Sequence, residues 1–295
     1  MQSLWMLLAS VMFACMGASI KYVLEHGATL ASVVLFRSIP SVFCIFLWAM
    51  LTHHSIKTNY PLAHFKRNIT GVAAMWLGFK ALGILPLATS TSLNYLSSLF
   101  IGLYVVFSAR NIKQDWLRLV LVLLGFAGVL LVLKPSINEE QWLGVLAGTG
   151  SGVLAAFAMM QVRSLGRLGE PVWRTVFYFS SVGILSGLFF MHPADYVNLS
   201  IQTWIVLVLT GLFGMFGQLA LTQAYGAGSP IIVAVLQYST IIFSAVLGIL
   251  FWHNIPDMTA WLGMFMVIFA GVSIVVVDQK AALSEKMHHL LHKKH

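Results

Sequence analysis

The sequence predicts an all-α integral membrane protein with ten transmembrane helices, arranged as two inverted five-helix repeats around a central cavity. The composition is the first reason: 59% of the 295 residues are hydrophobic and only 9% are charged, whereas about a quarter of a soluble domain is charged. The second is that apolar stretches recur at close to the roughly 20 residues that a membrane-crossing helix needs. The third is that a shift of 143 positions lays the first half of the chain over the second.

Each apolar stretch predicts one helix, and the loops between these stretches are short. In order, the ten stretches are 3–22, 30–51, 68–85, 88–108, 116–134, 142–163, 172–191, 203–224, 229–252 and 257–277. These boundaries predict a first repeat over residues 1–137, a second repeat over 138–278 and a basic cytoplasmic tail over 279–295. We expect no separate soluble domain.

The internal repeat consists of matching residues 143 positions apart. The pairs include Leu93 and Leu236, Tyr95 and Tyr238, Phe100 and Phe243, and the run FAGV at 126–129 and again at 269–272. A unit with an odd number of crossings must enter its second copy from the opposite side of the bilayer. Two inverted copies around a shared midplane are a common architecture of secondary transporters.

The formal net charge of +8 reflects membrane topology and not nucleic-acid binding. With a cytoplasmic N-terminus, thirteen basic residues fall in inner loops or the tail, and only Lys21 and Lys134 fall in outer loops. The thirteen are Lys57, Lys66, Arg67, Arg110, Lys113, Arg118, Arg163, Arg167, Arg174, Lys280, Lys286, Lys293 and Lys294. This bias follows the positive-inside rule and predicts that both termini are cytoplasmic, in a bacterial inner membrane.

Two basic residues fall deep within predicted spans. Arg37 lies about 10 Å below the outer face, at a rise of about 1.5 Å per residue, and Lys80 reaches a similar depth from the outer end of its span. One interpretation is that they hold an anionic group of a substrate, with Trp76 as an aromatic wall. The other is that they snorkel outward, or bond to carbonyls freed by Pro40 within the same span.

Spans 4 and 9 each carry a polar face, and the two faces correspond under the repeat. Their polar residues are Ser90, Thr91, Asn94, Ser97 and Ser98 in span 4, and Gln237, Thr240 and Ser244 in span 9, with Tyr95 and Tyr238 beside them. The shift also places Lys80 on Gln223. These side chains either line one central path or form hydrogen bonds between helices, and we favour the path for Asn94 with Gln237 and for Tyr95 with Tyr238.

The sequence shows no motif of an enzyme, a cofactor site or a metal site. All acidic residues and all histidines are expected in loops or at span ends, which argues against a proton relay inside the membrane. The chain lacks a P-loop, a zinc-protease motif and a nucleophile elbow. The histidines near the C-terminus belong to a basic tail, which is better explained by solvation near anionic lipids than by metal binding.

The chain resembles the drug/metabolite transporter superfamily and, within it, the EamA family, over residues 3–277. The shared features are ten spans in two repeats, an arginine in span 2 within "LFRSIPS", and the repeat endings "GFAGVLLVL" and "IFAGVSIVVV". The resemblance implies a cavity lined by spans 3, 4, 8 and 9. The lining residues it implies are Lys80, Asn94, Tyr95, Gln223, Gln237 and Tyr238. One departure is that Asn111 and Asn254 stand where members often carry a glutamate.

These observations predict a secondary transporter that moves a small polar, anionic organic metabolite, amino-acid-like or similar, by alternating access. The expected substrate-binding residues are Arg37, Trp76, Lys80, Asn94, Tyr95, Ser98, Gln223, Gln237, Tyr238 and Thr240. The expected partners are the substrate and membrane lipids, with no cofactor and no nucleic acid. The alternatives are a multidrug efflux permease and, in another class, an intramembrane enzyme or a lipid scramblase with a polar groove open to lipid.

Overall fold

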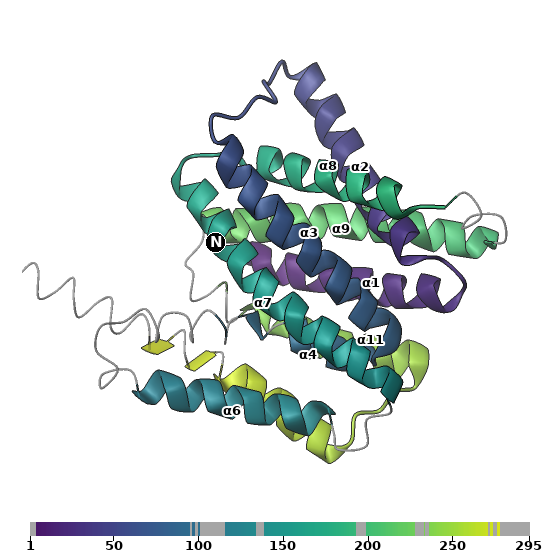
Figure 1. The fold of residues 1–295 in the computed structure, drawn as a ribbon, viewed down its shortest axis with the longest axis vertical. Helices are drawn as coiled ribbons and strands as arrows, with labels where there is room; N and C mark the ends of the chain where they lie inside the picture. Colours follow the sequence, from purple (N-terminus) through teal and green to yellow (C-terminus); the bar gives the residue numbers. More distant parts are fainter. Residues whose placement is uncertain are drawn as a thin grey trace, which may run out of the picture.

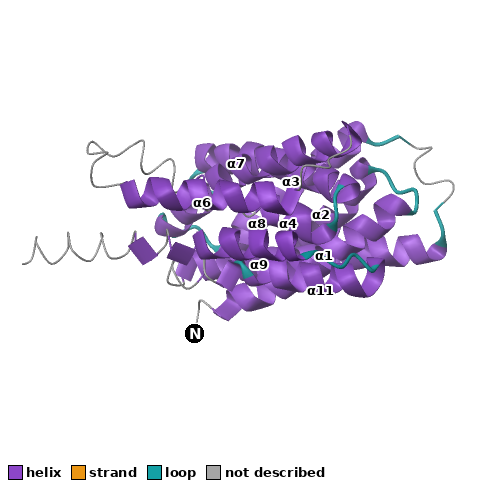
Figure 2. Ribbon diagram, turned by 90° about the horizontal axis from the view of Figure 1, so that it is seen from below, coloured by secondary structure: helices purple, strands orange, loops and turns teal. Residues whose placement is uncertain are grey.

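The computed structural model describes residues 4–94, 96–97, 100, 116–133, 139–192, 199–227, 233, 236–270, 272–273 and 276–277. Every regular element in this part of the chain is a helix (Figure 2). The labelled helices are α1 (Trp5–Glu25), α2 (Leu30–Leu51), α3 (Pro61–Ile84), α4 (Leu87–Asn94), α6 (Trp116–Leu133), α7 (Glu139–Arg167), α8 (Val172–Phe190), α9 (Ile201–Ala227) and α11 (Ser239–Trp252). A further apolar helix runs over Met258–Ala270.

Five described helices are long and apolar enough to cross a membrane. They are Trp5–Glu25, Leu30–Leu51, Gln141–Arg167, Val172–Phe190 and Ile201–Gly226. Large apolar side chains are exposed on the outer surface of the bundle, including Phe43, Phe189 and Phe265, which are 65%, 81% and 63% exposed. So much exposed apolar surface is typical of a lipid-facing protein. The prediction of an all-α integral membrane protein therefore agrees with the structure.

The helices pack in pairs that combine the two halves of the chain. α3 lies along α7 and α1 lies along α9, while α2 packs against both α8 and α9 (Figure 1). α4 contacts both α7 and α11. At the edge of the bundle, α6 approaches the helix 258–270 closely, since a Cβ on Gly128 would lie 2.8 Å from the carbonyl oxygen of Gly263.

α3 begins seven residues earlier than the predicted span at 68–85. Pro61 occupies its first turn, where the missing N–H of proline costs nothing. His64 and Arg67 are therefore helical, and each is 3% exposed. His64 lies in the first turn of α3, which agrees with the prediction that histidines lie in loops or at span ends, but Arg67 is not a loop charge. Of the other residues assigned to inner loops, Lys57 lies in a loop and Lys66 is exposed near the start of α3. Six lie outside the described residues: Arg110, Lys113, Lys280, Lys286, Lys293 and Lys294.

Pro40 lies inside α2, as predicted. It frees the carbonyl of Phe36, four residues earlier, and a free carbonyl in a bilayer must be covered by protein or water. α9 covers it: a Cβ on Gly211 would lie 2.4 Å from the Phe36 oxygen and 2.6 Å from Pro40 Cγ. Glycine at position 211 thus allows α9 to seal the proline site in α2.

Candidate functional site

A cavity of about 170 Å³ lies within the bundle, lined by residues of α1, α2, α3, α4, α7, α8, α9 and α11. By the same kind of measure a single water needs about 10–15 Å³, so the cavity has room for a small solute. The residues that line it in the described part of the chain include no aspartate, glutamate or histidine. Its only charged lining residues there are Arg37 and Arg67.

Arg37 reaches the cavity from the first half of α2. It is 3% exposed, and its Nη2 donates a hydrogen bond to Oε1 of Gln218 on α9 at 3.1 Å. Its guanidinium carbon lies 5.0 Å from the centre of the Phe179 ring. Its side chain passes Gly214, where a Cβ would come within 2.9 Å of Arg37 Cγ. Arg37 thus bonds a neutral amide, and not a carbonyl freed by Pro40.

Arg67 reaches the same cavity from the first half of α3. Its guanidinium carbon lies 4.3 Å from the centre of the Phe179 ring. The guanidinium covers Gly71, one turn along the helix, where a Cβ would overlap Nη1. Nε and Nη1 of Arg67, like Nε of Arg37, are buried without a hydrogen-bond partner among the described residues. A buried charge without a partner is costly, about 3 kcal/mol for an arginine in mid-membrane.

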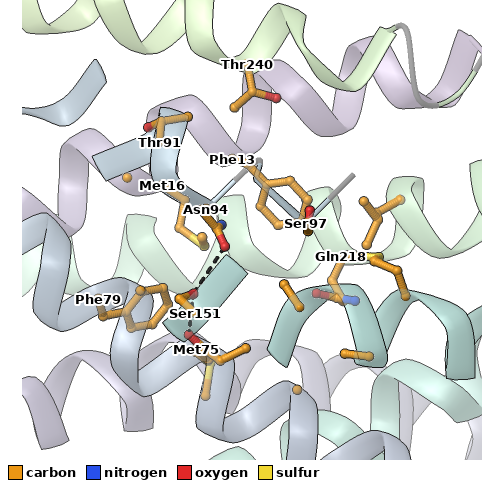
Figure 3. A pocket seen from close by; sticks show the side chains of 18 of the residues that line it. Phe13, Met16, Met75, Phe79, Thr91, Asn94, Ser97, Ser151, Gln218 and Thr240 are labelled. Carbon is orange, nitrogen blue, oxygen red and sulfur yellow. Dashed lines mark hydrogen bonds between the residues drawn. The ribbon is translucent and has the colours of Figure 1, made fainter. Parts of the chain in front are cut away.

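Neutral polar groups form another wall of the cavity. Ser151 Oγ on α7 contacts Asn94 Oδ1 on α4 at 3.1 Å and also the Ala74 carbonyl on α3 at 2.8 Å (Figure 3). Thr91 donates to Ser244 at 3.1 Å, which joins α4 to α11. These bonds show that part of the predicted polar face of span 4 serves contact between helices while it also lines the cavity.

Apolar side chains complete the lining. Phe13, Met16, Met75 and Phe79 surround the polar residues in the close-up view (Figure 3). Thioethers and aromatic rings adapt to ligands of varied shape. The site therefore combines two fixed cations, a few amides and hydroxyls, and an adaptable apolar surround.

The structure brings four of the predicted residues to the cavity. These are Arg37, Asn94, Gln237 and Thr240. Gln237 accepts a hydrogen bond from the hydroxyl of Tyr225, so α9 is joined beside the cavity to the segment just before α11. Tyr95 and Ser98 lie outside the described residues.

Four other predicted residues lie elsewhere. Lys80 is exposed and is not brought to Arg37. Trp76 is partly buried and donates from Nε1 to Ser186 on α8 at 3.1 Å. Gln223 lines a separate cavity beside the turn between α7 and α8. Tyr238 is 2% exposed and belongs to an apolar cluster.

Sequence reasoning missed Arg67, Phe179, Gln218 and Ser151. Arg67 was assigned to an inner loop because it follows Lys66 and precedes the apolar stretch at 68–85. A signal was available, since Gly71 falls on Gly214 under the 143-residue shift. The structure places an arginine against each of these two glycines.

A second group of charged residues is buried at the end of the bundle where α3 and α8 begin. His64 Nε2 lies 3.0 Å from Glu170 Oε1, and Arg174 Nη1 lies 3.3 Å from the same oxygen. Arg174 also donates to the Ser55 carbonyl at 2.8 Å. Burial alone would raise the pKa of Glu170, but hydrogen bonds from His64 and Thr58 and the charge of Arg174 together lower it. We call His64, Glu170 and Arg174 the terminal triad.

Another ion pair lies at the opposite end of the bundle, where α1 and α11 end. Lys21 Nζ lies 3.1 Å from Glu25 Oε1 and 3.3 Å from the Leu85 carbonyl oxygen. Trp252 Nε1 donates to Glu25 Oε2 at 2.6 Å. This contact joins α1, α11 and the turn after α3, and the Glu25 side chain is 38% exposed.

Comparisons with known proteins show similarity to membrane transporters. Residues 142–277 match the model of the EamA-like transporter family. The chain is 30% identical over 272 residues to the pseudopaline exporter CntI of Pseudomonas aeruginosa (strain UCBPP-PA14), covering 90% of this chain and 93% of the exporter. It is 23% identical over 238 residues to the S-adenosylmethionine uptake transporter of Rickettsia bellii (strain RML369-C), covering 79% of each.

A solved structure shares the fold. It superposes with a TM-score of 0.63 and 16% sequence identity, covering 95% of this chain and 97% of that one. At this identity the likeness concerns the fold alone. The named relatives are membrane transporters and not enzymes.

Proposed function

This chain belongs to the EamA-like transporter family, and on that premise we propose that it is a secondary transporter of a small polar, anionic organic metabolite. The single observation that carries the proposal is the cavity shared by both halves of the chain, whose only described charged lining is two arginines. A positively charged cavity attracts anions and disfavours cations. The proposed site residues are Arg37, Arg67, Asn94, Gln218, Gln237 and Thr240.

We further propose alternating access between two inverted five-helix repeats, over residues 1–137 and 138–278. The helix contacts support this arrangement because they occur in matched pairs. The contact of α3 with α7 corresponds to that of α9 with α1, and the contact of α2 with α9 corresponds to that of α8 with α3. The match to the family model over 142–277 lies within the proposed second repeat. The two repeats would rock about the cavity and expose it to each side in turn.

The membrane proposed is a bacterial inner membrane, with both termini and the basic tail in the cytoplasm. The bacterial relatives and the excess of basic residues in the assigned inner loops support it. The printed names of the relatives include both an exporter and an uptake transporter. The proposal therefore concerns what the cavity binds and leaves the direction of movement to experiment.

The other functions considered fit the site less well. A permease for cationic drugs would be served by an acidic residue in the cavity, and the described lining has none. A scramblase needs a polar groove open sideways to lipid, whereas Ser90, Ser97, Gln237 and Thr240 are each at most 3% exposed. The polar faces of α4 and α11 thus point inward.

Transport by purified protein in proteoliposomes tests the proposal. Preloaded liposomes should exchange a radiolabelled anionic metabolite with saturable kinetics, and empty liposomes should not. Because the cavity lining described here has no carboxylate or imidazole, exchange should proceed without a pH gradient. Strict dependence on that gradient would contradict the exchange mechanism, and failure to move any metabolite of a broad library would contradict the function.

A further inference from the structure

Arg37 and Arg67 both lie close to the same aromatic ring, that of Phe179. Both are 3% exposed, and both guanidinium groups lie within 5.0 Å of the centre of the Phe179 ring. They come from α2 and α3, so two separate helices bring a positive charge to the same part of the cavity. Like charges repel most strongly where water is excluded, so this arrangement is unfavourable in the empty protein.

No acidic residue that the structure describes neutralises these arginines. Each of the three acidic side chains with a described position already has partners. Glu25 pairs with Lys21, Glu170 with His64 and Arg174, and Asp257 caps the helix 258–270 through the amide of Ala260. The only hydrogen bond given for either guanidinium goes to the neutral Gln218. Three guanidinium nitrogens remain buried without a partner in the described structure.

The backbone beside each arginine is shaped to receive it. Gly71 lies under the Arg67 guanidinium, and Gly214 lies against the Arg37 side chain. Any larger residue at position 71 would occupy the place of Nη1. The two arginine side chains thereby lie in the wall of the cavity, and three of their buried nitrogens keep unused donors.

We propose that Arg37 and Arg67 together bind a solute with two negative charges, with a small organic dicarboxylate as the preferred class. This inference rests on the proposed function and specifies its substrate. Each planar guanidinium can bind one carboxylate through two parallel hydrogen bonds. The amides of Asn94, Gln218 and Gln237 would bind the uncharged part of the solute. A phosphate monoester carries the same charge, and the experiment below separates the two.

Thermal stability of the purified full chain in detergent tests the inference with three four-carbon probes. Succinate is a dianion, butyrate a monoanion and putrescine a dication, and inorganic phosphate serves as the phosphate probe. A ligand that binds the folded state raises its melting temperature. Succinate should raise the melting temperature of the wild type, butyrate should do so less, and putrescine should not. A larger shift with phosphate than with succinate would overturn the preference for dicarboxylates.

R37Q and R67Q should each lower the apparent affinity for succinate at least tenfold. This affinity is measured from the succinate-induced shift in melting temperature. K66Q is the matched control, because Lys66 precedes Arg67 on the same helix but is exposed. R67Q should also raise the melting temperature of the empty protein, because it removes a buried charge that lacks a partner. A purely structural arginine would give the opposite result, a lower melting temperature without ligand.

The inference is overturned if R37Q or R67Q keeps the wild-type response to succinate, or if butyrate stabilises the wild type as well as succinate does. If either glutamine variant cannot be purified, R37K and R67K decide the matter. They keep the charge but lose the paired hydrogen bonds, so a response equal to that of the wild type would contradict the proposal. Saturable transport of neutral or cationic solutes without any response to dianions would reject this inference alone. The absence of any transport would reject the proposed function.

Discussion

α3 carries two buried basic side chains, one turn apart, in opposite situations. His64 belongs to the terminal triad, where Glu170 accepts from it and Arg174 completes the cluster. Arg67, three residues later, meets an aromatic ring and a glycine but no acid among the described residues. The first arrangement ties α3 to α8 and to the loop before α3. The second leaves hydrogen-bonding capacity unused at a cavity wall.

The comparison distinguishes buried charges that stabilise the fold from buried charges that are available to bind a solute. A balanced cluster stabilises the folded chain only while all its members remain, because removing one leaves another buried and unpaired. An unbalanced pair of cations destabilises the empty protein and is compensated when an anion arrives. The two regions should therefore respond to substitution in opposite directions.

The largest effect is expected from Glu170→Gln. It leaves Arg174 and any protonated His64 without a carboxylate, and breaking a buried ion pair costs about 3–5 kcal/mol. Thermal unfolding in detergent should show a clearly lower melting temperature, with the succinate-induced shift retained in the folded fraction. Glu25→Gln at the other end is the control. Because that side chain is 38% exposed, its loss should cost about 1 kcal/mol or less.

Gly71→Ala should weaken binding without unfolding the chain. The added Cβ would overlap Arg67 Nη1, so the guanidinium must shift from its place against Phe179. A lost charge-assisted hydrogen bond is worth about 1.5–3 kcal/mol, which corresponds to roughly tenfold or more in apparent affinity. Uptake kinetics in proteoliposomes would measure it. Gly226→Ala is the matched control, because nothing lies within 4 Å of a Cβ there; equal losses in both variants would remove the role assigned to Gly71.

A smaller effect on the melting temperature is expected from a change of pH, and it should act through the terminal triad. Because the pKa of Glu170 is lowered from its ordinary value of 4.5, its contribution to stability is complete above about pH 4.5. It is lost as the pH falls through the lowered value in the folded state. Melting temperatures measured from pH 7 to pH 3 should therefore fall less steeply below pH 4.5 in Glu170→Gln than in the wild type. Parallel curves would show that Glu170 does not contribute.

The smallest effect is expected from Lys80→Gln. The exposed position of Lys80 supports the interpretation that its side chain snorkels rather than binds solute. Transport rates and the succinate response should stay within about twofold of the wild type, because an exposed charge interacts weakly. If Lys80→Gln reduced transport or the succinate response as much as R67Q does, Lys80 would have to be a binding residue. The distinction between exposed and cavity-facing cations would then be wrong.

The sequence was sufficient to predict the membrane class, the helical architecture and part of the site, because these depend on apolar length and on periodic polar faces. Arg37, Asn94, Gln237 and Thr240, which the sequence proposed for the site, all line one cavity. The sequence did not predict the position of Arg67, because the apolar stretch 68–85 does not indicate that the helix begins earlier, at Pro61. Burial of the turn that carries His64 and Arg67 depends on α8, whose side chains Phe179 and Arg174 are distant in the sequence.

Ser151 has a consequence for the speed of the proposed cycle. Its hydroxyl lies within hydrogen-bond distance of both Asn94 Oδ1 and the Ala74 carbonyl, while Ser151 belongs to the other half of the chain. Because a hydroxyl has one proton, it donates to one of these two acceptors at a time, and rocking of one half against the other must break that bond before the cavity can change sides. At a net value of about 1 kcal/mol, the bond would add about 1 kcal/mol to the barrier, or roughly fivefold in turnover. The Ser151 hydroxyl would thus lower the turnover rate of the transporter.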